Sequence, residues 1–170
     1  MSTITTPVDT DSPWLSGPQE VAWRRLLFTY LRLHTRLSQD MAANSALTYP
    51  DYLILVALTD IECNKARLFE LTNALGWEKS RLSHQVQRMI DRGLLKRSPC
   101  KEDHRGTYVA PTAKGLAALK AAAPAHAKLV KQLFVDRLSP EQLRVLSTLP
   151  EIVPDYLEAD ERSKDSSKES

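Results

Sequence analysis

The stretch GWEKSRLSHQVQRMIDRGLLKRSPCKEDHRGTYVAPTAKG, residues 76–115, carries most of the unusual chemistry of the chain. It holds two of the four histidines and one of the two cysteines. Between Glu78 and Arg105, eight Lys/Arg residues stand against four Asp/Glu residues, a net charge of +4, whereas residues 151–170 carry −4. The overall charge of +2 therefore conceals a basic central segment and an acidic end.

A helix placed over residues 78–93 separates its side chains into two faces. At about 100° per residue, the apolar side chains fall within one narrow sector, and the opposite side is polar and mostly basic. We predict that the apolar sector packs against the preceding helix and that the polar side is exposed. The apolar sector holds Leu82, Val86, Met89, Ile90 and Gly93, and the polar side holds Arg81, His84, Arg88 and Asp91 with Ser80, Gln87 and Arg92 at its edges.

The groups on the polar side are those that read base edges in a DNA groove. An Arg guanidinium can donate two hydrogen bonds to guanine, a Gln amide can pair with adenine, and Ser adapts to either. Short polar residues near the helix start can also place N–H groups against a phosphate. A merely solvated helix face is the plainer interpretation. The short turn before the helix, the scarcity of acids on its polar side and the basic segment after it favour a DNA-binding surface.

Two short strand candidates, LLKRS and GTYVAP, follow this helix and are joined by the polar segment PCKEDHR. They predict a β-hairpin whose basic tip lies beside the helix. We expect Lys96 and Lys101 to approach the DNA backbone, and Arg105 to enter a narrow minor groove, which attracts arginine. Asp103 would orient Arg105, since a carboxylate is repelled by phosphate.

Local signals predict the remaining elements. Ser16 and Gln19 have capping-box spacing and open a helix that runs to about Met41. A second helix begins near Pro50, and ARLFELTNALG predicts a short third helix that Gly76 ends. After the hairpin, one helix begins after Thr112 and another after Ser139, and Pro124 should kink or interrupt the first of these two.

This order predicts a mainly α fold with a small β-hairpin wing: a winged helix-turn-helix flanked by N- and C-terminal dimerisation helices. The expected domain organisation has five parts. They are a flexible arm over 1–15, a dimerisation helix over 16–48, the winged helix-turn-helix over 49–112, C-terminal dimerisation helices over 113–157 and a disordered tail over 158–170.

The segment LTNALGWEKSRLSHQVQRMIDRGLLKRSPCKEDHRGTYVAPTAKG resembles the DNA-binding core of the MarR family of bacterial transcriptional regulators. The resembling features are the helix KSRLSHQVQRMIDRGLL, the D-x-R-G wing and the following T-x-x-G. The order of flanking helices extends the resemblance over roughly residues 18–153. The wing departs from the pattern at Lys101, where a proline commonly follows the cysteine.

The resemblance implies a homodimer that binds double-stranded DNA at a pseudo-palindromic operator, often as a repressor that a small molecule releases. On this basis the expected DNA contacts are Lys79, Ser80, Arg81, Ser83, His84, Gln87, Arg88, Lys96, Lys101 and Arg105.

An aromatic or phenolic effector is expected near Tyr30, His34 and Tyr52, because relatives bind such molecules between the dimerisation helices and the winged domain. A core histidine is the plainer interpretation of His34. Two alternatives stay open: a winged-helix protein-interaction module without DNA binding, and a redox-sensing regulator that uses Cys63 and Cys100.

Other functional classes lack support in the sequence. Cys100, His104 and His84 do not have the spacing of a zinc site, so we expect no metal and no cofactor. The GxSxG and GxxxxGK[ST] signatures are absent, which argues against an enzyme. The longest apolar run, Leu53–Leu58, is too short to cross a bilayer, and the N-terminus does not read as a secretory signal. We expect a cytoplasmic protein with free thiols.

Overall fold

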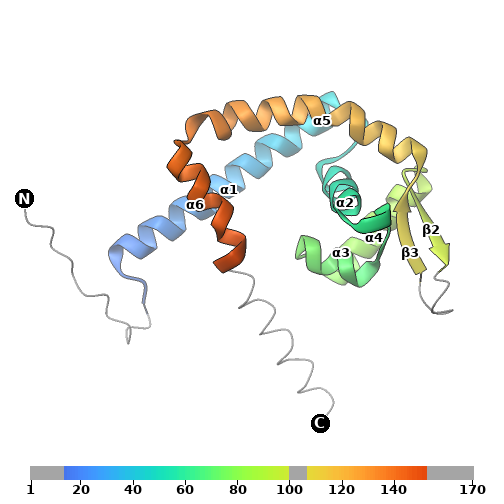
Figure 1. Cartoon of the computed structure of the whole chain (residues 1–170), viewed down its shortest axis with the longest axis horizontal. Helices are drawn as coiled ribbons and strands as arrows, with labels where there is room; N and C mark the ends of the chain where they lie inside the picture. The colour runs from blue at the N-terminus through green and yellow to red at the C-terminus, as the bar shows by residue number, and fades with distance from the viewer. Residues whose placement is uncertain (1–13, 100–106, 153–170) are drawn as a thin grey trace, which may run out of the picture. The chain divides into compact units, whose positions relative to one another are not determined.

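The computed structural model describes residues 14–99 and 107–152. They form mainly helices with one small sheet, as the sequence predicts (Figure 1). In chain order the elements are α1 (Gly17–Asn44), α2 (Tyr49–Asp60), the 3₁₀ turn η1 (Glu62–Asn64), β1 (Ala66–Arg67), α3 (Leu68–Leu75), α4 (Lys79–Asp91), β2 (Leu95–Pro99), β3 (Thr107–Pro111), α5 (Ala113–Leu133), the 3₁₀ turn η2 (Val135–Arg137) and α6 (Pro140–Ile152).

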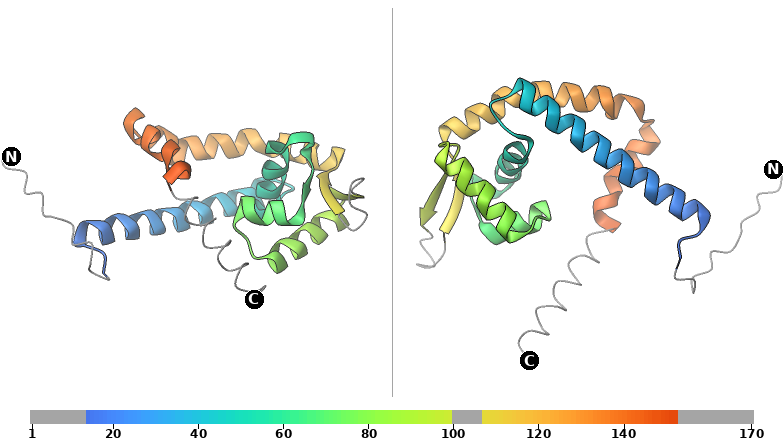
Figure 2. Two further views of the ribbon diagram at one scale, coloured as in Figure 1. Left: turned by 60° about the horizontal axis from the view of Figure 1, so that its bottom comes forward. Right: turned by 180° about the vertical axis from the view of Figure 1, so that it is seen from behind.

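The chain divides into two compact units, Met1–His126 and Ala127–Ser170. The first unit contains the winged helix-turn-helix, in which α2, α3 and α4 gather beside the sheet (Figure 2). The second unit contains the end of α5, η2 and α6, which begins after Ser139 as predicted, with the Ser139 N–H donating to Gln142 Oε1 at 2.8 Å. Within residues 14–99 and 107–152, none of the helices has both the length and the apolar composition of a membrane-spanning segment.

One hydrophobic core holds the first unit together. It joins α2, α3, α4, the sheet and the facing parts of α1 and α5, and most of its side chains are fully buried. The buried members are Met41, Leu47, Ile54, Leu55, Leu58, Ala66, Leu71, Leu82, Val86, Met89, Leu94, Leu95, Val109 and Ala122.

Short-range signals set the helix ends. Gln19 Oε1 accepts from the Ser16 N–H at 2.9 Å, which confirms the predicted start of α1. Gly76 and Gly93 follow α3 and α4 at φ values of 61° and 70°, a left-handed conformation that only glycine adopts without steric cost. The turn between α3 and α4 and the return from α4 into β2 therefore depend on these two positions.

The sheet has three strands in the order β1–β3–β2, all antiparallel. The predicted hairpin is confirmed, with Lys96 opposite Ala110 and Arg97 opposite Val109. The prediction that the third helix includes Ala66 was wrong. Ala66 and Arg67 are extended and pair with β3, and the helix begins only at Leu68 because Glu70 accepts from the Arg67 N–H at 2.6 Å. A two-residue strand has no periodicity by which its sequence could reveal it.

The start of α5 lies against the end of α4. Thr112 Oγ1 accepts from the Gly115 N–H at 3.0 Å, as its predicted role as N-cap requires, and donates to the Gly93 carbonyl at 2.7 Å. A Cβ on Gly115 would lie 2.1 Å from the Leu94 carbonyl oxygen, so only glycine fits this approach. Pro124 does not interrupt α5, contrary to one of the predicted outcomes. The helix runs from Ala113 to Leu133, and the proline removes only one backbone donor.

Candidate nucleic-acid interface

Helix α4 presents the two faces that its sequence predicts. Leu82 and Met89 are fully buried and Val86 nearly so, while Ile90 is half-buried at the edge of the core. Six of the seven predicted contacts on this helix are exposed, and Ser83 alone is half-buried. The exposed six are Lys79, Ser80, Arg81, His84, Gln87 and Arg88.

Two arginines on the exposed face are held by neighbouring side chains. The Arg81 guanidinium lies 4.5 Å from the ring centroid of Trp77, a cation–π contact at the start of the helix. Arg88 donates to Oε1 of Gln85, one turn earlier on the same helix. Both side chains are therefore oriented before any partner binds.

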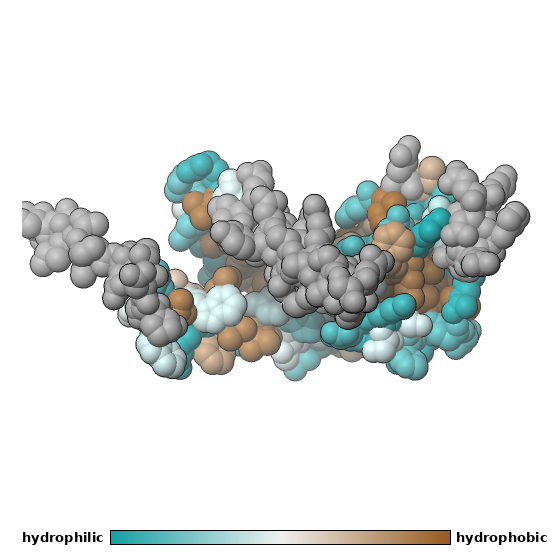
Figure 3. All heavy atoms as spheres, turned by 90° about the horizontal axis from the view of Figure 1, so that it is seen from below, coloured by the Kyte–Doolittle hydropathy of each residue, from teal (hydrophilic) through white to brown (hydrophobic). Residues whose placement is uncertain are grey.

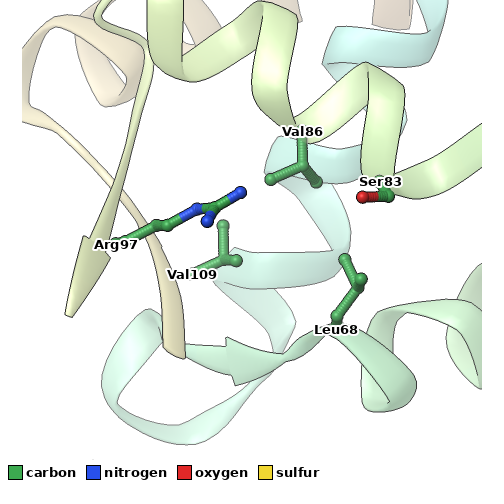
Figure 4. A pocket seen from close by; sticks show the side chains of 5 residues that line it. All are labelled: Leu68, Ser83, Val86, Arg97 and Val109. Atoms are coloured by element: carbon green, nitrogen blue, oxygen red, sulfur yellow. The ribbon is translucent and has the colours of Figure 1, made fainter. Parts of the chain in front are cut away.

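The wing contributes a further basic residue that the sequence did not assign to the site. Arg97, on β2, donates to Gln87 Oε1 at 3.0 Å, and Gln87 Nε2 donates to Asp91 at 2.8 Å. Figure 4 shows the Arg97 guanidinium pointing from the strand towards α4, beside a cavity of about 160 Å³. The cavity is lined by Leu68, Ser83, Val86, Arg97 and Val109.

The other predicted wing contacts divide between described and undescribed residues. Lys96 is exposed on β2, on the same strand as Arg97. Lys101 and Arg105 lie outside the described residues, as do Cys100, Asp103 and His104. The structure thus brings α4 and the base of the wing together. The DNA contacts expected of Lys101 and Arg105 stay a prediction.

A buried carboxylate on α2 anchors the inner side of α4, and sequence reasoning missed it. Asp51 has no exposed surface. Its Oδ1 accepts from Gln85 Nε2 at 2.6 Å, and its Oδ2 accepts from Arg92 Nη1 at 2.6 Å and from the Thr48 N–H at 2.8 Å. Arg92 also donates to the Ala46 carbonyl at 2.7 Å. Arg92, expected at the edge of the exposed face, therefore joins the C-terminal end of α4 to Asp51 on α2 and to Ala46 just before that helix.

A signal for part of this anchor is present in the sequence. Thr48 and Asp51 have the spacing of a capping box, and Gln85 is a polar residue inside the otherwise apolar sector of α4. Gln85 and Arg92 lie 34 and 41 residues after Asp51, and no local pattern pairs them with it. Burial alone would raise the pKa of Asp51, but hydrogen bonds from Thr48 and Arg92 and the Arg92 charge outweigh it. The pKa lies below its ordinary value of 3.8.

A cluster of aromatic rings joins α1, α2 and α5 within the first unit. The predicted residues Tyr30 and His34 lie 5.9 Å apart, measured between ring centroids. The ring of the third predicted residue, Tyr52, lies 4.4 Å from that of His126. Tyr49 links the two pairs, at 5.3 Å from His34 and 5.9 Å from His126. Tyr49 and His126 were not among the predicted residues.

Burial governs the ionisation of this cluster. It raises the pKa of both Tyr49 and Tyr52, and at Tyr49 the neighbouring tyrosines add to the effect. It lowers the pKa of His126 below the ordinary value of 6.5, against the opposing influence of the Asp40 carboxylate. Tyr49, Tyr52 and His126 are therefore uncharged at neutral pH, and their rings suit an aromatic partner.

The fold and its residues resemble proteins of known structure. The MarR family model matches residues 47–107. AbsC, a MarR family transcriptional regulator from Streptomyces coelicolor, is 34% identical, with 87% of this chain and 99% of that chain covered and a TM-score of 0.78. The chain belongs to the MarR family.

Two further structures of MarR-like fold extend the comparison. Sco3205, also a MarR family regulator from Streptomyces coelicolor, was solved in complex with DNA. It is 31% identical, with 86% and 92% of the two chains covered and a TM-score of 0.79. BpsR of Bordetella bronchiseptica, whose DNA binding is regulated by 6-hydroxynicotinic acid, shares the fold at 22% identity and a TM-score of 0.68, with 85% and 99% covered. No curated protein matches the chain.

The remaining candidate chemistry of this MarR-family chain is sparse. Within residues 14–99 and 107–152, no group of three or more His, Cys, Asp or Glu side chains is placed to hold a metal. Cys63 is an exposed free thiol in the 3₁₀ turn η1, in a left-handed backbone conformation with a φ of 63°. Redox sensing through Cys63 and Cys100 stays a prediction.

Asp51 generates a prediction about stability and pH. Because its folded pKa is depressed, its contribution to stability is complete above the unfolded pKa and is lost as pH falls towards the folded pKa. We expect Asp51→Asn to lower the free energy of unfolding by about 2 kcal/mol at neutral pH, since it removes hydrogen bonds to a charged group. The difference between wild type and variant should shrink below pH 3.8 in urea titrations. A difference that is constant down to about pH 2.5 would contradict this assignment.

Proposed function

We propose that this MarR-family chain is a sequence-specific DNA-binding regulator of transcription, acting as a repressor. The observation that carries the proposal is the exposed polar face of α4, with basic β2 beside it and hydrophobic residues confined to the opposite side. An α-helix with this face fits the major groove of B-DNA. The DNA complex of Sco3205, at 31% identity, supports the same role here.

The contacts divide by chemistry. Arg81, Arg88 and Gln87 carry the groups that recognise guanine and adenine, and Ser80 and His84 stand on the same exposed face. Ser83 is half-buried beside Arg97 and would act only at the margin of this surface. The residues proposed to hold phosphates or enter the minor groove are Lys79, Lys96, Lys101 and Arg105.

A homodimer is part of the proposal, because one winged unit reads only a half-site. Helix α1 exposes large apolar side chains, and hydrophobic residues interrupt the polar surface along it in Figure 3. Such exposure on a regular helix is typical of a covered interface. The exposed apolar residues of α1 are Val21, Trp23, Leu26, Leu27, Phe28, Tyr30 and Leu31.

The homodimer predicts a mass and a spacing. Sedimentation should give about twice the 19.1 kDa of one chain, and the two half-sites on DNA should lie roughly 34–36 Å apart.

The test of DNA binding is a salt series with duplexes selected from a random pool. We expect log K to fall linearly with log salt, with a slope of about −0.9 per neutralised phosphate. Lys96→Ala and Arg105→Ala should weaken binding to all sequences. Arg88→Ala should also relax specificity, by roughly 1–3 kcal/mol at one base pair.

Lys128→Ala, an exposed change on α5, is the matched control and should leave the slope unchanged. Absent or salt-independent binding would contradict the proposal and favour a winged-helix protein-interaction module. Equal loss of specificity in Arg88→Ala and Lys96→Ala would show that the assigned roles are wrong.

We further propose that the aromatic cluster receives a small aromatic or phenolic effector. The supporting observation is that rings from α1, α2 and α5 meet there and that His34, Tyr49, Tyr52 and His126 are only partly buried. An effector between these rings would contact both α1 and the first helix of the winged domain. Such contacts would allow it to change the DNA-binding unit.

With 4-hydroxybenzoate as the probe, we expect NMR shifts at the Tyr52 and His126 rings and weaker binding to the selected duplex. His126→Ala should reduce probe affinity, since it removes the ring closest to Tyr52. His84→Ala, an exposed change on α4, should not. Unchanged ring signals across a panel of hydroxybenzoates at millimolar concentration would contradict this location for the effector.

A further inference from the structure

Gln85 is a buried amide between a buried carboxylate and an exposed arginine. Its side chain belongs to a residue only 6% exposed. Nε2 donates to Asp51 Oδ1 at 2.6 Å, and Oε1 accepts from the Arg88 guanidinium. The hydrogen bonds therefore run without a gap from α2, through the core-facing side of α4, to the face proposed to read DNA.

The chemistry of the three groups fixes the direction of the amide. An ionised carboxylate only accepts hydrogen bonds, and a guanidinium only donates them. Gln85 must therefore turn its NH₂ group towards Asp51, which leaves its carbonyl oxygen for Arg88. The bridge needs one side chain that both donates and accepts hydrogen bonds. A carboxylate at position 85 could not donate to Asp51, and a guanidinium there could not accept from Arg88.

The fold does not need Gln85 to neutralise Asp51. Arg92 already pairs with the carboxylate at 2.6 Å, and the Thr48 N–H caps it at 2.8 Å. Both of these bonds reach Oδ2, whereas Oδ1 accepts from Gln85 Nε2, so Gln85 completes the hydrogen bonding of the buried carboxylate. The oxygen at the other end of the same amide accepts from Arg88, so Gln85 links this exposed arginine to the anchor.

We propose that Gln85 is a positioning residue for sequence recognition: anchored by Asp51, it holds the Arg88 guanidinium in one orientation before DNA arrives. This inference rests on the proposed function of α4. An arginine side chain loses rotamer entropy when it binds, and part of that loss occurs in the folded protein here. Arg88 engages Gln85 through one terminal nitrogen, which leaves other N–H groups for a guanine.

The position of Gln87 offers a built-in comparison. Its amide is also occupied at both ends, by Arg97 and Asp91, but all three side chains are exposed. Water competes for those bonds, whereas the Gln85 bridge is shielded at its Asp51 end. We therefore expect specificity to depend more on Gln85, which does not face DNA, than on the Arg97 contact.

The decisive variant is Gln85→Met, which keeps the length of the side chain and removes the amide. Arg88→Ala first identifies the base pair at which discrimination is lost. The measured quantity is then a specificity ratio: the affinity for the selected duplex divided by the affinity for a duplex that is changed at this base pair. We expect this ratio to fall roughly tenfold, the lower part of the range for one bidentate base contact. Affinity for non-specific DNA and the salt slope should not change.

A double-mutant cycle separates positioning from general damage. In an Arg88→Ala background, Gln85→Met should cause no further loss of the ratio, because the side chain that it positions is gone. An unchanged ratio in Gln85→Met alone, or an equal further loss in the Arg88→Ala background, would overturn the proposal. Arg97→Ala serves as the exposed counterpart and should change the ratio less.

A second measurement tests whether Arg88 is restrained in the free protein. It applies even where Gln85→Met does not fold or the wild type does not bind DNA. In wild-type protein without DNA, ¹⁵N relaxation of the Arg88 Nε–H should show a restrained side chain. Free rotation of Arg88 in the folded wild type would overturn the positioning role. A restrained Arg88 in a protein that binds no DNA would instead leave the bridge intact and refute only the proposed function.

Discussion

A single buried carboxylate constrains the arrangement of the winged unit. Asp51 has no exposed surface, and an ionised group in that setting is tolerated only when it is paired and hydrogen-bonded. Its partners are Thr48, the N-cap of its own helix, Gln85 on α4 and Arg92 at the C-cap of α4, the last two lying 34 and 41 residues away. Since Gln85 and Arg92 are two helical turns apart, bonding both to one carboxylate constrains how α4 lies across α2.

The same arrangement explains why one helix serves two purposes. Its apolar sector completes the core around Leu82 and Met89, and its opposite side remains free of that packing. The wing follows directly, because Gly93 reverses the chain and Gly115 permits α5 to approach Leu94 closely. The proposed DNA surface is thus a product of core packing, whereas the aromatic cluster around Tyr49 is a separate feature that reaches α1.

The sequence predicts what depends on local patterns and fails where distant residues meet. Periodicity gave the two faces of α4 correctly, and capping spacings gave the helix starts after Ser16 and Thr112, because these features depend on neighbours within a turn or two. The strand at Ala66 was missed because it exists only through pairing with Val109, 43 positions along the chain. His126 and the Asp51 anchor were missed for the same reason, and the wing tip with Arg105 stays a prediction.

Hydrogen exchange over α4 tests the central claim, that the carboxylate on α2 holds the proposed recognition helix. In wild type, the amides of residues 79–91 should be protected, and in Asp51→Asn they should exchange at least about tenfold faster, the change that roughly 1.4 kcal/mol of lost anchoring produces. Amides of 140–149, in the second unit, should exchange at the same rate in both proteins. Unchanged protection of 79–91 in Asp51→Asn would contradict the account, because α4 would then be held without its anchor.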